Sequence, residues 1–259
     1  MAGPRSSSYT KDECRLWAEN PALAHRSAEE YAPGLPTRRQ LRETLKRVSI
    51  RRRRWALRGG LLLPDKAVYL LVIPGFADWE PAHAVAELRR HGHYRVEVVG
   101  LSPDVVESMG GIRVQPTRSL VDVDPDDVAV FILPGGDRWE KQPLEPALKD
   151  LLHTLDQKGV PIAAICAATT AVARAGLLRG RRHTSNGLRY LQQQVPEYTE
   201  HGAYVDAPAV RDRGLITASG LADVEFASAI MTELGVLSVD DRTIWTNLFR
   251  SGRLPDGAV

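Results

Sequence analysis

The sequence predicts an α/β protein in which a mostly parallel sheet is covered by helices on both faces. From Lys66 onward, short runs of apolar and often β-branched residues alternate with longer segments of helical periodicity. The apolar runs are nearly continuous, as is typical of strands that are buried on both faces. One of these runs ends in Cys166, which small residues and a helical segment follow at once. Together these features predict a three-layer sandwich with a sharp turn from strand to helix.

The elements are expected at regular intervals along the chain. Five strands are predicted near residues 67–73, 94–100, 128–133, 162–165 and 215–218. Five helices are predicted near residues 81–91, 144–158, 168–175, 188–194 and 223–234. The tripeptide Met109-Gly110-Gly111 adds a hairpin turn at the edge of the sheet.

The first part of the chain differs in charge from the rest. Residues 37–60 hold ten lysines and arginines against one acid, although the whole chain carries only +2, so the remainder is acidic overall. We expect a basic extension over residues 1–65, partly helical or disordered, an α/β domain over 66–236 and a tail over 237–259. An acidic domain is a poor ligand for nucleic acid, which only the basic extension is suited to bind through phosphates.

Apolar runs and cysteines limit the possible environments. No apolar run approaches the roughly 18 to 20 residues of a membrane-spanning helix, and the first residues lack the apolar region of a secretory signal. A cytoplasmic protein that does not enter membranes is therefore expected. The only two cysteines, Cys14 and Cys166, form neither a disulfide framework nor a zinc-finger pattern. Any cysteine chemistry therefore depends on one thiol.

Cys166 is the strongest candidate for that chemistry. It lies between the strand at 162–165 and the helix that begins near Ala168. In parallel α/β sheets, ligands bind at the carboxyl ends of strands, where helix N-termini offer free N–H groups. Such a position favours the thiolate, which is the nucleophilic form. The alternative is a buried structural cysteine, a common state of free cysteine.

Two more loops are predicted at the same end of the sheet. Gly135 and Gly136 follow the third strand, so the N–H groups of Gly136 and Ala167 are candidates for stabilising an oxyanion, although Pro-Gly-Gly alone is an ordinary turn. Glu80 follows the first strand. It is either a first-turn acid favoured by the helix dipole or a buried carboxyl that donates to the thiol.

These three loops, in this order and at these separations, resemble the DJ-1/ThiJ/PfpI superfamily, relatives of the class I glutamine amidotransferases. The resemblance covers roughly residues 66–236. It implies a flavodoxin-like three-layer sandwich with a cysteine nucleophile elbow, and a homodimer. By this resemblance Cys166 corresponds to the nucleophile, Glu80 to the family's carboxyl, and Gly136 and Ala167 to the oxyanion donors.

The chain departs from the family pattern at two places. Ala168 replaces the usual glycine two residues after the cysteine. The family's frequent histidine falls within residues 182–186, where Asn186 takes its place and His183 lies three residues earlier, so His183 is retained as a catalytic candidate. The residues expected to line the pocket are Gly135, Asn186, Trp79 and Trp139.

No metal or other cofactor is expected. Glu80 and His83 lie one helix turn apart, with His91 and His93 following, but dispersed surface histidines are commoner than a metal site of this kind. The sequence has no P-loop, no Gly-x-Gly-x-x-Gly and no Gly-x-Ser-x-Gly motif. Nucleotide binding and serine hydrolysis therefore lack their usual signatures.

The resemblance implies a cysteine-dependent hydrolase or lyase that acts on a small molecule. The activities known in the superfamily include amidase, peptidase, deglycase or glyoxalase, and isocyanide hydratase. The alternative is a non-enzymatic redox sensor or stress protein in which Cys166 is oxidised reversibly, because accessible thiols of low pKa oxidise readily.

Overall fold

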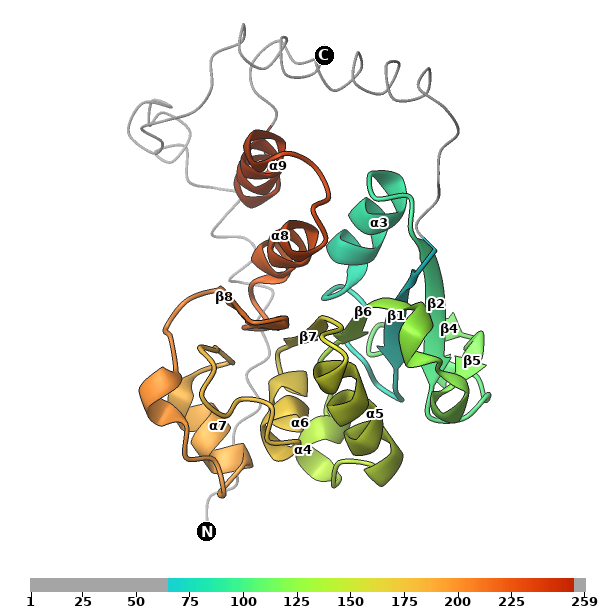
Figure 1. Cartoon of the computed structure of the whole chain (residues 1–259), viewed down its shortest axis with the longest axis vertical. Coiled ribbons are helices and arrows are strands. Elements are labelled where there is room, and N and C mark those ends of the chain that lie inside the picture. The colour runs from blue at the N-terminus through green and yellow to red at the C-terminus, as the bar shows by residue number, and fades with distance from the viewer. Residues whose placement is uncertain (1–64, 254–259) are drawn as a thin grey trace, which may run out of the picture. The chain divides into compact units, whose positions relative to one another are not determined.

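The computed structural model describes residues 65–253, which form a seven-stranded sheet with helices on both faces (Figure 1). The strand order is β5-β2-β1-β6-β7-β9-β8, and all neighbours are parallel except β8 and β9. The strands are β1 (Ala67–Val72), β2 (Arg95–Gly100), β5 (Arg118–Ser119), β6 (Val128–Leu133), β7 (Ile162–Ile165), β8 (Ala209–Asp212) and β9 (Leu215–Ala218). The flavodoxin-like α/β fold is confirmed.

The helices divide between the two faces of the sheet. One face is covered by α3 (Ala82–Arg90), α8 (Asp223–Glu233) and α9 (Val239–Ser251). The other is covered by α4 (Arg138–Lys141), α5 (Pro146–Gln157), α6 (Ala168–Arg174) and α7 (Leu188–Gln194) (Figure 1). Short 3-10 helices span η2 (Leu120–Asp122), η3 (Pro125–Asp127) and η4 (His201–Ala203).

Strand β6 shows why the central strands are apolar throughout. Val130 and Ile132 pack into the core beneath α3 and α8, whereas Phe131 and Leu133 pack into the core beneath α5 and α6. Because successive side chains of a strand point to opposite faces, a strand with helices on both sides needs apolar residues at every position.

The predicted strands and helices are confirmed to within two residues at each end. The hairpin turn at 109–111 is also confirmed, and it joins β3 (Val106–Glu107) to the antiparallel β4 (Arg113–Val114). These two strands form a separate two-stranded sheet and do not extend the edge of the main one.

Several elements of the structure were not predicted, among them β5, α4, β8 and α9. Strand β8 is short and pairs antiparallel with β9, and α9 occupies most of the segment assigned to a C-terminal tail. Helix α9 begins at a Ser238 cap, whose hydroxyl accepts a hydrogen bond from the Asp241 N–H at 3.1 Å. It packs on α8 and buries Trp245 against the core of that face.

The predicted basic extension and Cys14 fall outside the described residues. Between residues 65 and 253, no helix has both the length and the apolar character needed to cross a membrane.

Candidate active site

Cys166 occupies a strained turn at the carboxyl end of the central strand β7. Its φ is +59°, a left-handed conformation that costs a residue other than glycine about 1 kcal/mol or more. The Cys166 N–H still donates to the Ala218 carbonyl at 2.9 Å, which continues the pairing of β7 with β9. The side chain is partly exposed and packs at the border of both cores. The turn therefore presents the thiol at the edge of the sheet.

Glu80 places a buried carboxyl against this thiol. Its side chain is 1% exposed, its Oε2 accepts a hydrogen bond from the Gly135 N–H at 2.5 Å, and it is hydrogen-bonded to Cys166. Burial raises the pKa of Glu80 to about 7, although the hydrogen bonds from Gly135 and Cys166 act in the opposite direction. A substantial fraction of Glu80 therefore keeps its proton at neutral pH.

The pKa of the Cys166 thiol is not lowered as its position alone predicted. Burial, and then the charge of an ionised Glu80, raise the pKa of Cys166 to about 11. Hydrogen bonds from the Asn186 side chain and the Ala167 N–H favour the thiolate but do not outweigh these effects. The prediction counted the helix end and a protonated Glu80 that donates to the thiol, whereas burial of the sulfur and the charge of an ionised Glu80 have the larger effect.

The two groups titrate as a pair, since each affects the other. Between pH values of about 7 and about 11, the pair of Glu80 and Cys166 holds a single proton. That proton resides either on sulfur, leaving a carboxylate, or on the carboxyl, leaving a thiolate. Because the pKa of Cys166 is the higher of the two, the carboxylate with a thiol is the major form near neutral pH, and the thiolate with a protonated Glu80 is the minor form.

Asn186 is held in the orientation that donates to the thiol. Its Oδ1 accepts a hydrogen bond from the Gly220 N–H at 2.9 Å, so its Nδ2 is the atom that faces Cys166 Sγ at 3.3 Å. Because a backbone N–H can only donate, this contact fixes which end of the amide reaches the sulfur. The structure brings Asn186 to the thiol, at the place where the family pattern has its histidine.

Two glycines allow the backbone to approach the pair closely. A Cβ atom on Gly135 would lie 2.8 Å from Glu80 Oε2, and one on Gly220 would lie 2.7 Å from Cys166 Sγ. Gly135 was predicted as a pocket residue, but Gly220 was not. Gly220 could have been identified from the sequence, because it follows a strand that ends at the same edge of the sheet as the strand before Cys166.

The two candidate oxyanion donors lie on neighbouring loops. The Ala167 N–H is hydrogen-bonded to the Cys166 sulfur. Gly136 pairs with Phe76 in an isolated bridge and has φ +151°, a conformation that favours glycine. A Cβ there would lie 2.9 Å from the Gly75 carbonyl oxygen. The loops after β1 and β6 are thus in direct contact beside the thiol.

His183 is not brought to Cys166. It is fully buried, with Nδ1 2.7 Å from the Arg181 carbonyl oxygen and Nε2 2.7 Å from the Tyr198 hydroxyl. Because the carbonyl can only accept, Nδ1 carries the proton and Nε2 accepts from Tyr198. Burial also lowers the pKa of His183, which favours the neutral ring. Both nitrogens are therefore occupied by partners other than the thiol.

The two tryptophans have different environments. Trp139 is buried, and its Nε1 donates to the Pro134 carbonyl at 2.8 Å, so the ring anchors the loop that carries Gly135. Trp79 precedes Glu80 and is 49% exposed. Trp139 therefore stabilises the loop, whereas Trp79 lies at the surface.

His83 and His91 each contact a carboxylate on the same face of the sheet. His83 Nε2 lies 3.4 Å from Asp223 Oδ2, and His91 Nε2 lies 3.1 Å from Glu87 Oε2. Among the residues from 65 to 253, no group of three or more histidine, cysteine or acidic side chains is arranged to hold a metal ion.

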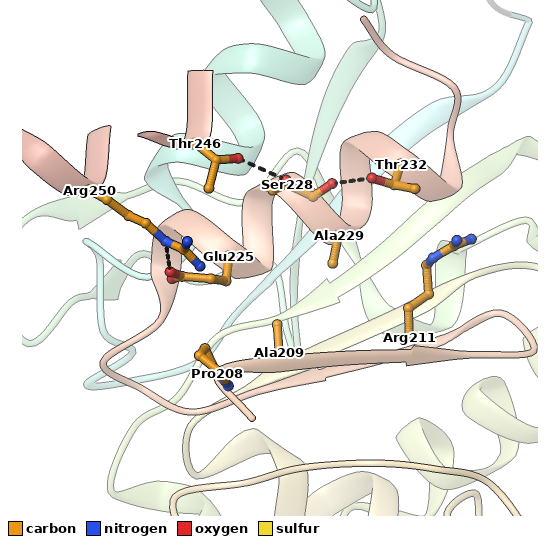
Figure 2. A pocket seen from close by; sticks show the side chains of 9 residues that line it. All are labelled: Pro208, Ala209, Arg211, Glu225, Ser228, Ala229, Thr232, Thr246 and Arg250. Carbon is orange, nitrogen blue, oxygen red and sulfur yellow. Dashed lines mark hydrogen bonds and ion pairs between the residues drawn. The ribbon is translucent and has the colours of Figure 1, made fainter. Parts of the chain in front are cut away.

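A separate pocket of about 280 Å³ lies between β8, α8 and α9 (Figure 2). Two arginines line it, but Arg211 is paired with Glu233 at 2.6 Å and Arg250 with Glu225. None of the predicted site residues contributes to this pocket. Both of its positive charges are therefore already paired with carboxylates.

Comparisons with known proteins find relatives over the residues that form this domain. Residues 66–233 match the model of the DJ-1/PfpI family. An uncharacterised protease of Bacillus subtilis, YoaZ, is 35% identical over 72% of this chain and 91% of its own length. A deglycase of Pyrococcus abyssi is 30% identical over 46% of this chain and 70% of its own length.

A solved structure gives the same result at the level of the fold. The DJ-1 superfamily protein from Agrobacterium tumefaciens superposes with a TM-score of 0.67 and 32% identity, covering 73% of this chain and all of the other. The family match spans more than half of the chain and includes Glu80, Gly135, Cys166 and Asn186. The chain therefore belongs to the DJ-1/PfpI family.

Proposed function

We propose that this protein is a cysteine-dependent enzyme of the hydrolase or deglycase type that acts on a small molecule. The observation that carries this proposal is the contact between the Cys166 thiol and the buried Glu80 carboxyl. A carboxyl with a pKa of about 7 can give up and regain a proton near neutral pH, as a general acid and base must. Relatives named as a protease and a deglycase support a reaction at a carbonyl carbon.

The reaction begins from the form of the pair in which Cys166 is a thiolate and Glu80 is protonated. With an amide as the example, the sulfur adds to the carbonyl carbon and the oxygen becomes an oxyanion facing the N–H groups of Gly136 and Ala167. As the C–N bond breaks, the leaving nitrogen takes the proton of Glu80. The Glu80 carboxylate then removes a proton from water, whose oxygen cleaves the thioester and releases the thiolate.

The proposal is tested by turnover of a panel of small amides and α-oxo carbonyl compounds. We expect the wild-type chain to turn over at least one class, Cys166→Ala to abolish that turnover, and Glu80→Leu to reduce it by about 100-fold or more, because a general acid contributes roughly that much. The control is Gly202→Ala, at a position where an added methyl group meets no atom within 4 Å.

Turnover that survives in Cys166→Ala contradicts the proposal. The redox alternative makes a different prediction: mild peroxide converts Cys166 stoichiometrically to an oxidised form, measured by intact mass, while no compound is turned over. That result would replace the enzyme by a sensor.

Other expectations remain proposals. We propose a homodimer in a cytoplasmic setting, a reaction that needs no metal, and a domain that folds without residues 1–64. Light scattering at micromolar concentration tests the dimer, and a monomer would contradict it. Turnover after chelation tests the need for a metal, and activity that is lost on chelation and restored by zinc would show that one is needed. Unfolding of a chain that starts at Asp65 tests the domain boundary, and loss of the cooperative transition would show that the boundary is wrong.

A further inference from the structure

A pair of buried hydroxyl groups joins the Cys166 turn to the loop that carries Asn186. Thr169 Oγ1 lies 2.6 Å from the Cys166 carbonyl oxygen and 2.6 Å from Ser185 Oγ. Thr169 is 0% exposed and Ser185 is 3% exposed, so bulk water does not compete for these contacts. The two hydroxyl groups thus connect the turn of the nucleophile with the loop of its hydrogen-bond donor.

Hydrogen-bonding chemistry fixes the direction of both contacts. A carbonyl oxygen can only accept, so the single proton of the Thr169 hydroxyl goes to the Cys166 carbonyl. The Ser185 hydroxyl must then donate to Thr169 Oγ1. The order of donation therefore runs from Ser185 through Thr169 to the backbone of Cys166.

The strained backbone of Cys166 is held on both sides. Its carbonyl also accepts from the Thr169 N–H at 3.1 Å, and its N–H donates to the Ala218 carbonyl at 2.9 Å. Both backbone polar groups of this left-handed residue are therefore fixed. The distance between the sulfur and its donor consequently depends on where the loop of Asn186 lies.

Ser185 is the last buried residue before the chain reaches Asn186. Residues 183–185 are buried, whereas Asn186 is exposed. The next residue, Gly187, has φ +133°, and a Cβ added there would meet no atom within 4 Å. Gly187 therefore has no side chain with which to hold the loop. The attachment of Asn186 to the protein core comes from the residue that precedes it.

The contacts close into a ring that contains the thiol. The ring runs from the Cys166 carbonyl through Thr169 and Ser185 to Asn186, whose Nδ2 returns to Cys166 Sγ at 3.3 Å. The Gly220 N–H determines which end of the Asn186 amide faces the sulfur. The hydroxyl contact of Ser185 acts on the backbone of the same loop, so it restrains how far the amide lies from the sulfur.

We propose that Ser185 is a positioning residue, which keeps the Asn186 side-chain nitrogen on the Cys166 sulfur by tying the Asn186 loop to Thr169. Ser185 acts through Asn186, so its effect on the thiol exists only while Asn186 is present. This inference rests on the proposed role of Cys166 as the nucleophile.

The test is a double-mutant cycle on the rate of iodoacetamide alkylation of Cys166 at pH 8, resolved by mass spectrometry so that Cys14 is counted separately. Ser185→Ala removes the link but leaves the Thr169 proton on the Cys166 carbonyl, so no buried donor loses its partner. We expect alkylation to slow by about threefold, because the thiolate loses part of a hydrogen bond. In the Asn186→Ala background the same substitution should have no effect.

Thr169→Ser separates the hydrogen bonds from the packing around them. This variant keeps the hydroxyl that accepts from Ser185 and donates to Cys166, and it loses only a buried methyl group. We expect a lower unfolding temperature, because a buried methyl group contributes to stability, but an alkylation rate equal to that of the wild type.

The matched control is Thr170→Val. Thr170 follows Thr169 in α6, is also 0% exposed, and donates its hydroxyl proton to the backbone carbonyl three residues earlier at 2.8 Å. Its other contacts are with Trp139 and Arg174. Thr170→Val therefore removes a hydroxyl group of the same kind from the same helix, and it should leave the alkylation rate unchanged.

The outcomes separate this inference from the proposed function. If Ser185→Ala alkylates at the wild-type rate, or slows the reaction equally with and without Asn186, the positioning role is wrong. A similar slowing in Thr169→Ser or Thr170→Val would also overturn it, since general loosening would then be the cause. Because alkylation needs no substrate, a non-additive cycle without any turnover contradicts the proposed function alone. Turnover with an additive cycle contradicts the positioning role alone.

Discussion

The Asn186 side-chain nitrogen lies 3.3 Å from the sulfur of Cys166, and a second hydrogen bond fixes the amide in this orientation. The Gly220 N–H holds the amide oxygen at 2.9 Å, so the NH₂ group must face the thiol. This donor lowers the pKa of Cys166 against the larger effects of burial and the Glu80 charge.

Removal of this donor should weaken the thiolate. We predict that Asn186→Ala raises the pKa of Cys166 and slows its alkylation at pH 8 by about three- to tenfold, because a hydrogen bond to a charged group is worth roughly 1 kcal/mol or more. The measurement is the alkylation rate at fixed pH, with the unfolding temperature as a check on integrity. An unchanged rate would show that the contact does not influence the thiol.

Replacement of Glu80 should change the shape of the titration. Glu80→Gln keeps an oxygen to accept from Gly135 and an NH₂ group to donate to sulfur, but it cannot ionise. We predict a single rise in alkylation rate at a pH below about 11, because the repulsion by the Glu80 carboxylate is lost. The measurement is the same pH series from 5 to about 10.

Glu80→Leu provides the comparison, since it removes both the charge and the donor. Its single rise should lie at higher pH than that of Glu80→Gln. A wild-type profile that matches Glu80→Gln over this range would show that Glu80 does not titrate near the thiol.

A methyl group on Gly220 should damage the site without harming the fold elsewhere. The Cβ of Gly220→Ala would lie 2.7 Å from Cys166 Sγ, so either the sulfur or the loop must move. A displacement of this size at a reacting atom can reduce turnover by about 100-fold. We predict that loss for Gly220→Ala and none for Gly202→Ala, whose added methyl group has open space. Equal activity of the two variants would mean that the thiol position is not critical.

His183 should behave as a structural residue. His183→Asn loses the contacts with Arg181 and Tyr198, so we predict a loss of about 1 to 3 kcal/mol in the free energy of unfolding. The pH profile of Cys166 alkylation should not change. A change in that profile at constant stability would restore His183 as part of the site.

The pH dependence of stability gives a second test of His183. Its pKa is lowered in the folded state from an ordinary 6.5, so its stabilising effect is complete above pH 6.5 and is lost as the pH falls. Glu80 acts oppositely: its pKa rises from 4.5 to about 7, which favours the folded state below pH 4.5, and this benefit is lost towards pH 7. Denaturant unfolding of Glu80→Gln, with and without His183→Asn, separates the two contributions.

The sequence predicted the elements that are buried on both faces more reliably than those at the edges. Strands β6 and β7 are apolar at every position, and no other element produces such short runs between turns. Strand β8 has only four residues, including Arg211 and Asp212, because the edge of a sheet needs little apolar surface. Helix α9 buries few side chains among many polar ones, so its periodicity is weak.

In the candidate site, too, features that follow from the fold were predicted more reliably than contacts between residues that are distant in the sequence. Residues at the ends of strands could be placed together from the fold class, and the resemblance to a known family supplied the partners Glu80 and Asn186. The lowered pKa predicted for Cys166 was wrong, because burial and a carboxyl more than 80 residues away outweigh a local helix end. His183 was placed wrongly because its partner Tyr198 comes from beyond α7. Such contacts have no signature in local spacing.

At position 166 the left-handed backbone favours glycine, whereas the proposed reaction needs a thiol. Glycine would adopt φ +59° at no steric cost, whereas cysteine retains a penalty of about 1 kcal/mol in every folded molecule. The backbone conformation at this position therefore favours glycine over the residue that is present. A descendant of this chain that no longer needed the thiol would be free to relieve this penalty by a substitution at position 166.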